Sequence, residues 1–199
     1  MGTGRSTRST GTIAMRLETL LWAVIGVLLS IAASFMEVFV PTAPWEWLND
    51  GLHVVSLGTR YQVAAVLLVA CLGGGTAAAL SQVAYLLLGL AGLPIFEGGG
   101  GWQYLSEPGF GYLLGFVPAG WLCGRWAFLG PPKVEQLAIG CAIGLVVLHS
   151  VGLLYAMAVR SSEFEAIAAT YSQAALPGQV VAACAAVTIA SVFRHLVFY

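Results

Sequence analysis

GLPIFEGGGGWQYLSEPGFGYLLGFVPAG, residues 92–120, is the stretch on which the fold depends, because it joins two apolar segments across a glycine-rich connection. Four consecutive glycines, at 98–101, give a backbone that adopts positive φ freely and amides that no side chain covers. Phe96, Trp102 and Tyr104 flank these glycines with aromatic surface. We expect either a lid that closes over a small, partly apolar molecule, or a plain loop with aromatic residues at a membrane interface.

Apolar segments lie on both sides of this stretch, and a membrane-spanning helix needs roughly 20 such residues. The ten-residue alternation of barrel strands is absent, so the spans are predicted to be helices. The second segment is short and could extend back toward Leu52. The sequence predicts an all-α integral membrane protein with a single six-transmembrane-helix domain in residues 16–199, after a flexible cytoplasmic tail in residues 1–15. The expected spans are 17–39, 62–72, 76–93, 109–128, 137–159 and 173–193.

Composition supports a membrane protein and excludes several function classes. The chain is 59% hydrophobic and 9% charged, whereas a soluble domain carries roughly 25% charged residues. Most of its exterior must therefore face a lipid bilayer. The net charge of -1 excludes nucleic acid as a partner, because phosphate binding requires clustered Lys and Arg.

Basic residues predict the orientation, since cytoplasmic loops carry an excess of Lys and Arg. With six spans, both termini lie on one side, and that side holds six of the eight basic residues. Arg60 and Arg160 fall on the other side. We therefore expect a multi-pass protein of the cell membrane with both termini cytoplasmic. The residues on the cytoplasmic side are Arg5, Arg8, Arg16, Arg125, Lys133 and Arg194.

Motifs for catalysis, nucleotides or metals are absent, so no enzyme, cofactor or metal site is predicted. The cysteines, Cys71, Cys123, Cys141 and Cys184, fall singly in different apolar segments. They are interpreted as small buried hydrophobic residues, with metal or redox use as the alternative. His149 lies within the fifth span, where an ionisable group usually faces the bundle interior. Its role is left open between structural hydrogen bonding, lining a ligand cavity and intramembrane catalysis.

Small residues form a stripe on the first span. Gly26, Ser30 and Ser34 are spaced by four and so share one helix face. Small residues let another helix approach closely. We predict that this stripe faces a partner subunit, with ordinary internal packing as the alternative.

An ordered set of residues resembles the BioY family, the biotin-binding S components of energy-coupling-factor (ECF) transporters, from Gln62 to about Val192. Gly-rich pieces are weak individually, but their order here is fairly specific. The residues that carry the resemblance are Gln62, Gly74, Leu80, Ser81, Tyr85, Gly89, Gly92, Leu93, Pro94, Phe96, Gly98, Gly99, Gly101, Pro108, Gly111, Tyr112, Leu113, Gly115, Phe116, Pro118, Leu176, Pro177 and Gly178.

This resemblance implies a six-helix bundle of the ECF S-component type with a biotin pocket near the outer face. It also implies partners, a transmembrane coupling subunit and paired ATPase subunits, and offers the Gly26, Ser30 and Ser34 stripe a role in contacting the coupling subunit. The chain departs from the family at two positions: Gln179 and Ala182 stand where family members commonly have Asp and Lys. Gln179 can still pair with a ureido group. A ligand carboxylate must use Arg60, Arg160 or amides of the glycine loop.

The resulting hypothesis is a substrate-binding subunit for biotin uptake that does no covalent chemistry. The alternatives are an S component for another vitamin, a structural subunit of a membrane complex, and a small intramembrane enzyme centred on His149. The predicted substrate-binding residues are Arg60, Gln82, Tyr85, Phe96, Gly98, Gly99, Gly101, Trp102, Tyr104, Tyr112, His149, Tyr155 and Gln179, and Phe96, Trp102 and Tyr104 form the predicted lid.

Overall fold

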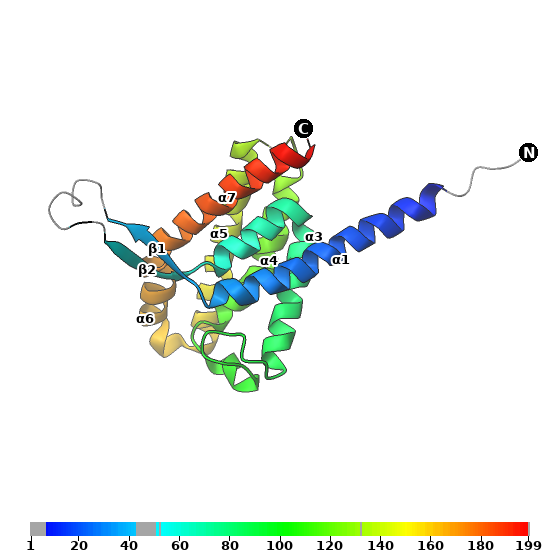
Figure 1. The fold of residues 1–199 in the computed structure, drawn as a ribbon. Coiled ribbons are helices and arrows are strands. Elements are labelled where there is room, and N and C mark those ends of the chain that lie inside the picture. The colour runs from blue at the N-terminus through cyan, green and yellow to red at the C-terminus, as the bar shows by residue number, and fades with distance from the viewer. Residues whose placement is uncertain (1–6, 43–50, 52, 132, 199) are drawn as a thin grey trace, which may run out of the picture.

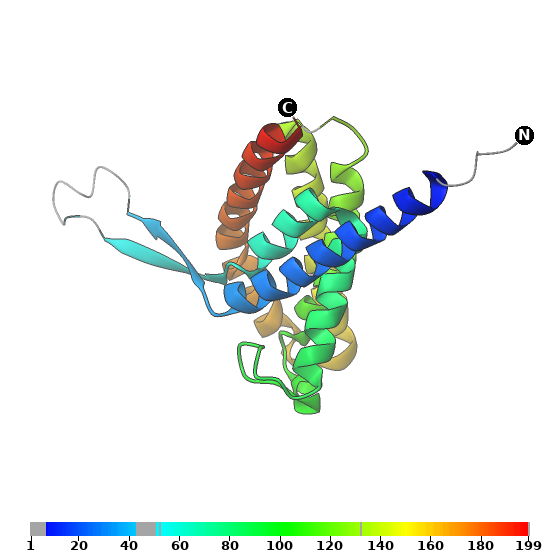
Figure 2. The same cartoon turned by 45° about the vertical axis from the view of Figure 1, so that its right-hand side comes forward.

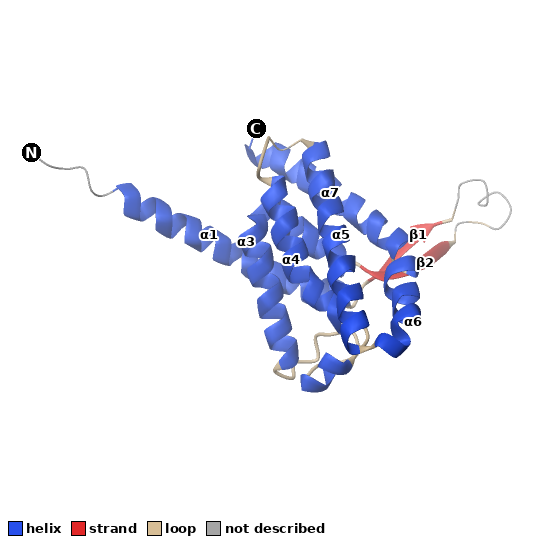
Figure 3. Ribbon diagram, turned by 180° about the vertical axis from the view of Figure 1, so that it is seen from behind, coloured by secondary structure: helices blue, strands red, loops and turns tan. Residues whose placement is uncertain are grey.

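A computed structural model describes residues 7–42, 51, 53–131 and 133–198, and it is predominantly helical (Figure 1). Within these residues five long helices pack into a bundle, with a two-stranded hairpin at one side (Figure 3). The elements in order are α1 (Thr7–Ser34), β1 (Glu37–Pro41), β2 (Val54–Arg60), α3 (Gln62–Leu90), η1 (Trp102–Ser106), α4 (Phe110–Ala127), α5 (Val134–Val159), η2 (Ser161–Glu163), α6 (Phe164–Ala168), the π-helical η3 (Ala169–Ala174) and α7 (Leu176–Phe198).

The predicted second and third spans form one element, α3, which bends sharply at Gly74. Gly74 has φ 84° and ψ 168°, a combination that residues with a Cβ avoid. The two arms return to the same place, because Gln62 and Tyr85 line one cavity, although a straight helix would separate them by about 35 Å. The expectation of six separate helices is therefore corrected to five long helices among the described residues, one of them with two arms.

Four helical stretches in the described residues are long and apolar enough to cross a membrane. They are Leu17–Ser34, Gln62–Leu90, Val134–Val159 and Ser161–Leu196. Helix α4 is not among them, since it carries Arg125, Pro118 and several glycines. It nevertheless packs centrally, between α3 and α5 (Figure 1).

Strands replace helix on both sides of the 42–53 connection. The first span was expected to continue to residue 39, but α1 ends at Ser34 and β1 follows. The possible extension of the second span toward Leu52 is also wrong, because residues 54–60 form β2. The β-branched and aromatic residues in these stretches favour strands, and the two strands pair antiparallel, with Glu37 opposite Arg60. At the other end, α1 begins at Thr7, inside the stretch expected to be a tail.

Helix α1 lies across α3, and its N-terminal half projects beyond the other helices (Figure 2). The predicted partner-facing stripe is buried in this contact: Gly26 packs against Ser81 of α3, and Ser30 and Ser34 are fully buried. Ser34 also donates a hydrogen bond of 3.1 Å to the Ile95 carbonyl. The prediction of a partner surface here is therefore corrected, and the stripe serves internal packing, the alternative reading.

Different segments of the chain lie at the two ends of the bundle (Figure 1). One end carries the hairpin, the 91–109 connection and the segments from η2 to η3. The other carries the α4–α5 connection and the C-terminal end of α7. Arg194 of α7 donates a 3.0 Å hydrogen bond to the Ala127 carbonyl at the end of α4, which holds these two helix ends together.

Candidate ligand-binding site

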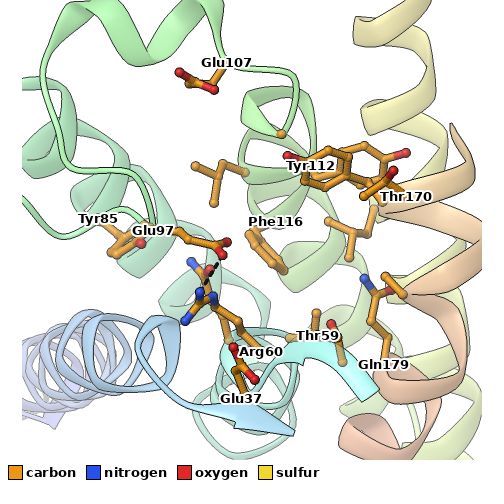
Figure 4. Close-up of a pocket in the computed structure, with 18 of the residues that line it drawn as sticks. Glu37, Thr59, Arg60, Tyr85, Glu97, Glu107, Tyr112, Phe116, Thr170 and Gln179 are labelled. Carbon is orange, nitrogen blue, oxygen red and sulfur yellow. Dashed lines mark hydrogen bonds and ion pairs between the residues drawn. The ribbon is translucent and has the colours of Figure 1, made fainter. Parts of the chain in front are cut away.

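A cavity of about 330 Å³ opens at the end of the bundle that carries the hairpin (Figure 4). Its size lies at the lower end of the range for small-molecule sites, about 300–1,000 Å³. Both arms of α3, strand β2, the 91–109 connection and helices α4, α5 and α7 contribute to it. The lining residues are Glu37, Gly58, Thr59, Arg60, Gln62, Val63, Tyr85, Glu97, Tyr104, Glu107, Gly109, Tyr112, Leu113, Phe116, Leu148, Thr170, Tyr171, Ala175 and Gln179.

Two aromatic groups form opposite walls of the cavity. Tyr112 and Tyr171 stack with ring centroids 5.5 Å apart and an interplanar angle of 25°. On the other wall, Phe96 lies between Tyr85 and Tyr104, with centroids 5.3 Å and 4.6 Å away. Phe96 is fully buried and does not line the cavity, so it supports the two tyrosines that do. Flat, apolar walls of this kind suit a ring system.

One ion pair lies between these walls. Arg60 donates a hydrogen bond of 2.5 Å to Glu97, and Figure 4 shows the pair with Tyr85 on one side and Tyr112 on the other. Of the described residues that line the cavity, Arg60 is the only basic one. The Glu97 hydrogen bond is the main cause that raises the pKa of Arg60 above its ordinary value, so the guanidinium stays charged. Burial raises the pKa of the Tyr104 phenol, which keeps it neutral.

A chain of hydrogen bonds fixes the amide of Gln179. His149 Nε2 lies 2.8 Å from Gln179 Oε1, and His149 Nδ1 lies 2.9 Å from Ser172 Oγ. Because the Gln oxygen only accepts, Nε2 carries the proton in a neutral imidazole, and Nδ1 accepts from Ser172. Ser172 Oγ then accepts from the Tyr112 hydroxyl, 2.7 Å away. Because the Gln179 oxygen accepts from His149, its amino group is left to donate a hydrogen bond to a ligand in the cavity.

Gln62 offers a second amide. It lines the cavity, and its Nε2 is buried with no hydrogen bond among the described residues, although the Tyr85 hydroxyl lies nearby. Tyr85 itself donates to the Ile95 carbonyl at 2.9 Å. An unpaired buried donor is unfavourable by about 1–3 kcal/mol. A ligand carbonyl would satisfy it.

Only some of the predicted binding residues lie at the cavity. The structure brings Arg60, Tyr85, Tyr104, Tyr112 and Gln179 together around the cavity. His149 lies behind this lining and contacts the cavity only through Gln179 and the Ser172–Tyr112 pair.

Three other predicted residues lie elsewhere. Gln82 is buried between helices and donates a 2.8 Å hydrogen bond to Ser30 of α1, because α1 covers this face of α3. The Tyr155 hydroxyl donates to the Leu105 carbonyl, so it holds the connection rather than the cavity wall. Trp102 is 72% exposed and does not line the cavity. These assignments are corrected accordingly.

The glycine loop has a different role from the one expected. Gly98, Gly99 and Gly101 do not line the cavity. Instead, Phe96 and Gly99 form a small bridge, and the Gly101 amide donates a 2.8 Å hydrogen bond to the Gly89 carbonyl at the end of α3. The amides of Gly99 and Gly101 are thus used within the protein. The predicted lid reaches the cavity through Tyr104 and through Glu97, which the prediction omitted.

Arg160, the other candidate for a ligand carboxylate, is not in the lining. It pairs with Glu163 at 3.0 Å and donates to the Ser106 carbonyl. Ala182 is also absent from the lining and is fully buried within α7. Arg60 is therefore the available guanidinium among the described lining residues.

Several lining residues were not predicted, among them Glu97, Glu107, Thr170 and Tyr171. Glu97 lies within residues 92–120, but no sequence motif marked it as a binding residue. Tyr171 lies in η3, a π-helical turn that precedes α7. Such turns are frequent at functional sites, but no sequence signal of this one was recognised.

Known proteins resemble this chain over almost its whole length. The BioY family matches residues 6–198. An uncharacterized 21.2 kDa protein in the psbX-ycf33 intergenic region of Cyanophora paradoxa is 27% identical over 180 residues, 89% of this chain and 95% of that protein. A probable biotin transporter BioY of Lysinibacillus sphaericus is 30% identical over 140 residues, 70% of this chain and 64% of that protein.

A solved structure has the same fold. The crystal structure of the S-component for biotin from an ECF-type ABC transporter superposes with a TM-score of 0.66 at 17% identity, covering 96% of this chain and 95% of that one. With the family match over residues 6–198, the resemblance expected from the sequence is confirmed: the chain belongs to the BioY family.

Proposed function

We propose that this protein is the substrate-binding membrane subunit of a biotin uptake transporter, which captures biotin at the outer face and delivers it with ATP-driven partners. The observation that carries the proposal is the 330 Å³ cavity with aromatic walls, amide donors and one guanidinium. Membership of the BioY family and the fold of a biotin S-component support it. Neither points to an enzyme.

Biotin has three chemical parts, and the cavity offers a group for each. Its apolar thioether ring fits between the Tyr112–Tyr171 stack and the Tyr85 wall. The ureido carbonyl accepts hydrogen bonds, and the amides of Gln179 and Gln62 donate them. The carboxylate tail pairs with Arg60, which is partly exposed at 27% and so lies toward the cavity mouth. Gln179 stands at the position of the Asp common in the family, but its amino group donates a hydrogen bond where a carboxylate can only accept one.

The distribution of charge supports a location for the two ends. Arg60 and Arg160 lie at the cavity end, whereas Arg194 and the end of α4 that carries Arg125 lie at the other. Under the positive-inside rule, the cavity end faces outward and both termini are cytoplasmic. Since no nucleotide-binding motif was found in the sequence, the energy for release into the cell would come from a transmembrane coupling subunit and ATPase subunits.

Titration of the detergent-purified protein with biotin tests this assignment, with thiamin and riboflavin as competitors. We expect saturable biotin binding at micromolar concentrations or below and no competition by the other two vitamins. Gln179→Ala should weaken binding, whereas Gln136→Ala, which removes the same type of side chain at the opposite end of the bundle, should not. Tight binding of another vitamin, or no binding at all, would identify a different S component or a structural subunit.

A further inference from the structure

Three cysteines that are far apart in the sequence meet inside the bundle. Cys71 of α3, Cys123 of α4 and Cys141 of α5 are all buried. The Cys71 sulfur lies 3.9 Å from that of Cys123 and 3.7 Å from that of Cys141, and all three sulfurs lie within 4.8 Å of one another. In the sequence these cysteines fall singly in different apolar segments, but the fold brings the three of them into one cluster.

These separations fit a metal site. Metal–sulfur bonds of about 2.3 Å place the sulfurs of a tetrahedral or trigonal site roughly 3.8–4.0 Å apart. The Cys71–Cys141 and Cys71–Cys123 sulfur separations, 3.7 Å and 3.9 Å, closely match that range, and the third pair of sulfurs lies within 4.8 Å. The chain is therefore arranged so that a single ion could bind all three sulfurs.

Close helix contacts hold the cysteines in place. A Cβ on Gly124 would lie 2.6 Å from Gly75 Cα, and one on Gly140 would lie 3.1 Å from the Cys123 carbonyl oxygen. A Cβ on Gly144 would lie 3.3 Å from Cys123 Cβ. These glycines let α3, α4 and α5 approach at the level of the cluster. Ligands that packing fixes in advance lose little freedom when an ion binds.

The surroundings determine which ion suits the site. Apolar side chains of the core, including Leu67, Ala70 and Leu137, enclose the cluster. Among the described residues no other His, Cys, Asp or Glu completes a fourth ligand position. Thiolate ligands select Cu(I), Zn²⁺ and iron–sulfur clusters. Structural zinc sites almost always have four ligands, and iron–sulfur clusters are held by four Cys. Three sulfurs without a fourth ligand therefore favour Cu(I).

Arg194 supplies a compensating charge. It is buried, its Nε has no hydrogen bond among the described residues, and it donates to the carbonyl of Ala127, one helical turn after Cys123 on α4. A buried cation is unfavourable unless an anion lies nearby. A copper–thiolate centre carries net negative charge, because each thiol that binds the metal releases its proton to solvent.

We infer that Cys71, Cys123 and Cys141 form a Cu(I)-binding site, separate from the vitamin cavity. The two sites lie at different levels of the bundle, and none of the three cysteines lines the cavity. Tyr112 and Phe116 near the start of α4 line the cavity, whereas Cys123 lies four residues before its end. This inference does not depend on the identity of the vitamin. Its competitor is simple packing of small side chains, which predicts no metal affinity beyond that of an exposed thiol.

Anaerobic titration of the purified, reduced full chain with Cu(I), against the chromophoric chelator bathocuproine disulfonate, tests the site. We expect one Cu(I) per chain to be withdrawn from the chelator. Loss of a group that merely supports a metal ligand lowers affinity by about 10–100-fold, so Cys123→Ala or Cys141→Ala should lower it by at least about 100-fold. Cys184→Ala is the matched control, since Cys184 is exposed and outside the cluster, and it should bind copper as the wild type does.

The thermal unfolding midpoint of each variant verifies that it has folded, and X-ray absorption at the copper edge of the wild type needs no variant. Three sulfur neighbours and no nitrogen or oxygen are expected. Failure of the wild type to compete with the chelator, or nitrogen or oxygen ligands at the copper, would overturn the proposal. So would copper loss in Cys184→Ala, or tighter binding of Zn²⁺ than of Cu(I).

Discussion

Arg60 Nη2 and Glu97 Oε1 lie 2.5 Å apart and join strand β2 to the connection that precedes η1, at the mouth of the cavity. The two side chains are 27% and 60% exposed. Exposed ion pairs contribute about 0–1 kcal/mol. A ligand carboxylate held further from water forms charge-assisted hydrogen bonds worth roughly 1.5–3 kcal/mol. These free energies favour replacement of the Glu97 carboxylate by a ligand carboxylate on Arg60.

Arg60→Ala should therefore weaken biotin binding by about 10–100-fold, the equivalent of 1.5–3 kcal/mol. Calorimetric titration measures the change. Biotin amide, whose tail is uncharged, should lose little affinity in the same variant. The control is Arg160→Ala, because Arg160 bonds to Glu163 and Ser106 outside the cavity. An equal loss for biotin and its amide would show that Arg60 does not hold the carboxylate.

Glu97→Gln should have the opposite effect. It removes the charge that competes with the ligand for Arg60, so biotin affinity should rise, by up to about fivefold given the strength of exposed ion pairs. The gain should disappear in the Arg60→Ala background, since the competition then no longer exists. A lower affinity in Glu97→Gln alone would mean that the carboxylate contacts the ligand or orders the loop instead.

The His149–Gln179 hydrogen bond predicts energetic coupling between the two residues. His149 fixes the Gln179 oxygen at 2.8 Å, so His149→Ala frees the amide to rotate and should reduce biotin affinity without direct contact. Residues within one hydrogen-bond network show coupling of about 0.5–3 kcal/mol in double-mutant cycles. Titrations of His149→Ala, Gln179→Ala and the double variant measure it. Additive losses would exclude positioning through this bond, and turnover of a substrate that requires His149 would favour an enzyme.

The sequence was sufficient for the long apolar segments, because their length and hydropathy are local properties. It was not sufficient where contacts between distant segments determine the structure. The bend at Gly74, where φ is 84°, joins two predicted spans into one element. From the sequence alone, any of the three consecutive glycines at 73–75 could have formed this bend. The small residues Ser30 and Ser34 suit a partner surface and an internal contact equally, and only the position of α3 distinguishes them.

The binding site shows the same division. Residues within the recognised family pattern, such as Tyr85 and Tyr112, lie at the cavity. Gln82 has the same polar character, but it lies on the α3 face that α1 covers. Its position could be predicted only from the packing of α1, which hydrophobicity alone does not determine. Glu97 and Tyr171 reach the cavity through a loop and a π-helical turn, whose shapes depend on contacts distant in sequence.

Gly74→Ala should destabilise the fold, because its φ and ψ are open essentially to glycine alone. A Cβ there would meet nothing closer than the Phe128 ring at 3.8 Å, so the effect comes from the backbone. Strain of about 1–3 kcal/mol is expected, seen as a lower thermal unfolding midpoint and less biotin binding. Thr76→Ala, at an exposed position two residues later, should be near neutral. An unchanged midpoint in Gly74→Ala would contradict the bend.

Two glycines of the loop provide a matched pair for the last prediction. A Cβ on Gly100 would lie 2.9 Å from the Gly89 carbonyl oxygen and even closer to the Leu93 backbone, whereas a Cβ on Gly98 would meet only the Tyr104 ring edge at 3.4 Å. Neither glycine has a positive φ, so the comparison isolates space from conformation. Gly100→Ala must push the loop away from the end of α3, at a cost of about 1–3 kcal/mol.

This displacement would also move Glu97 and Tyr104, which lie on either side of the glycines and line the cavity. Gly100→Ala should therefore lower both the thermal unfolding midpoint and the affinity for biotin, while Gly98→Ala changes each only slightly. Limited proteolysis should cut the 91–109 connection faster in Gly100→Ala alone. If the two variants behaved alike, the loop would not be held against α3 as the Gly101–Gly89 hydrogen bond indicates, and its glycines would serve flexibility rather than close packing.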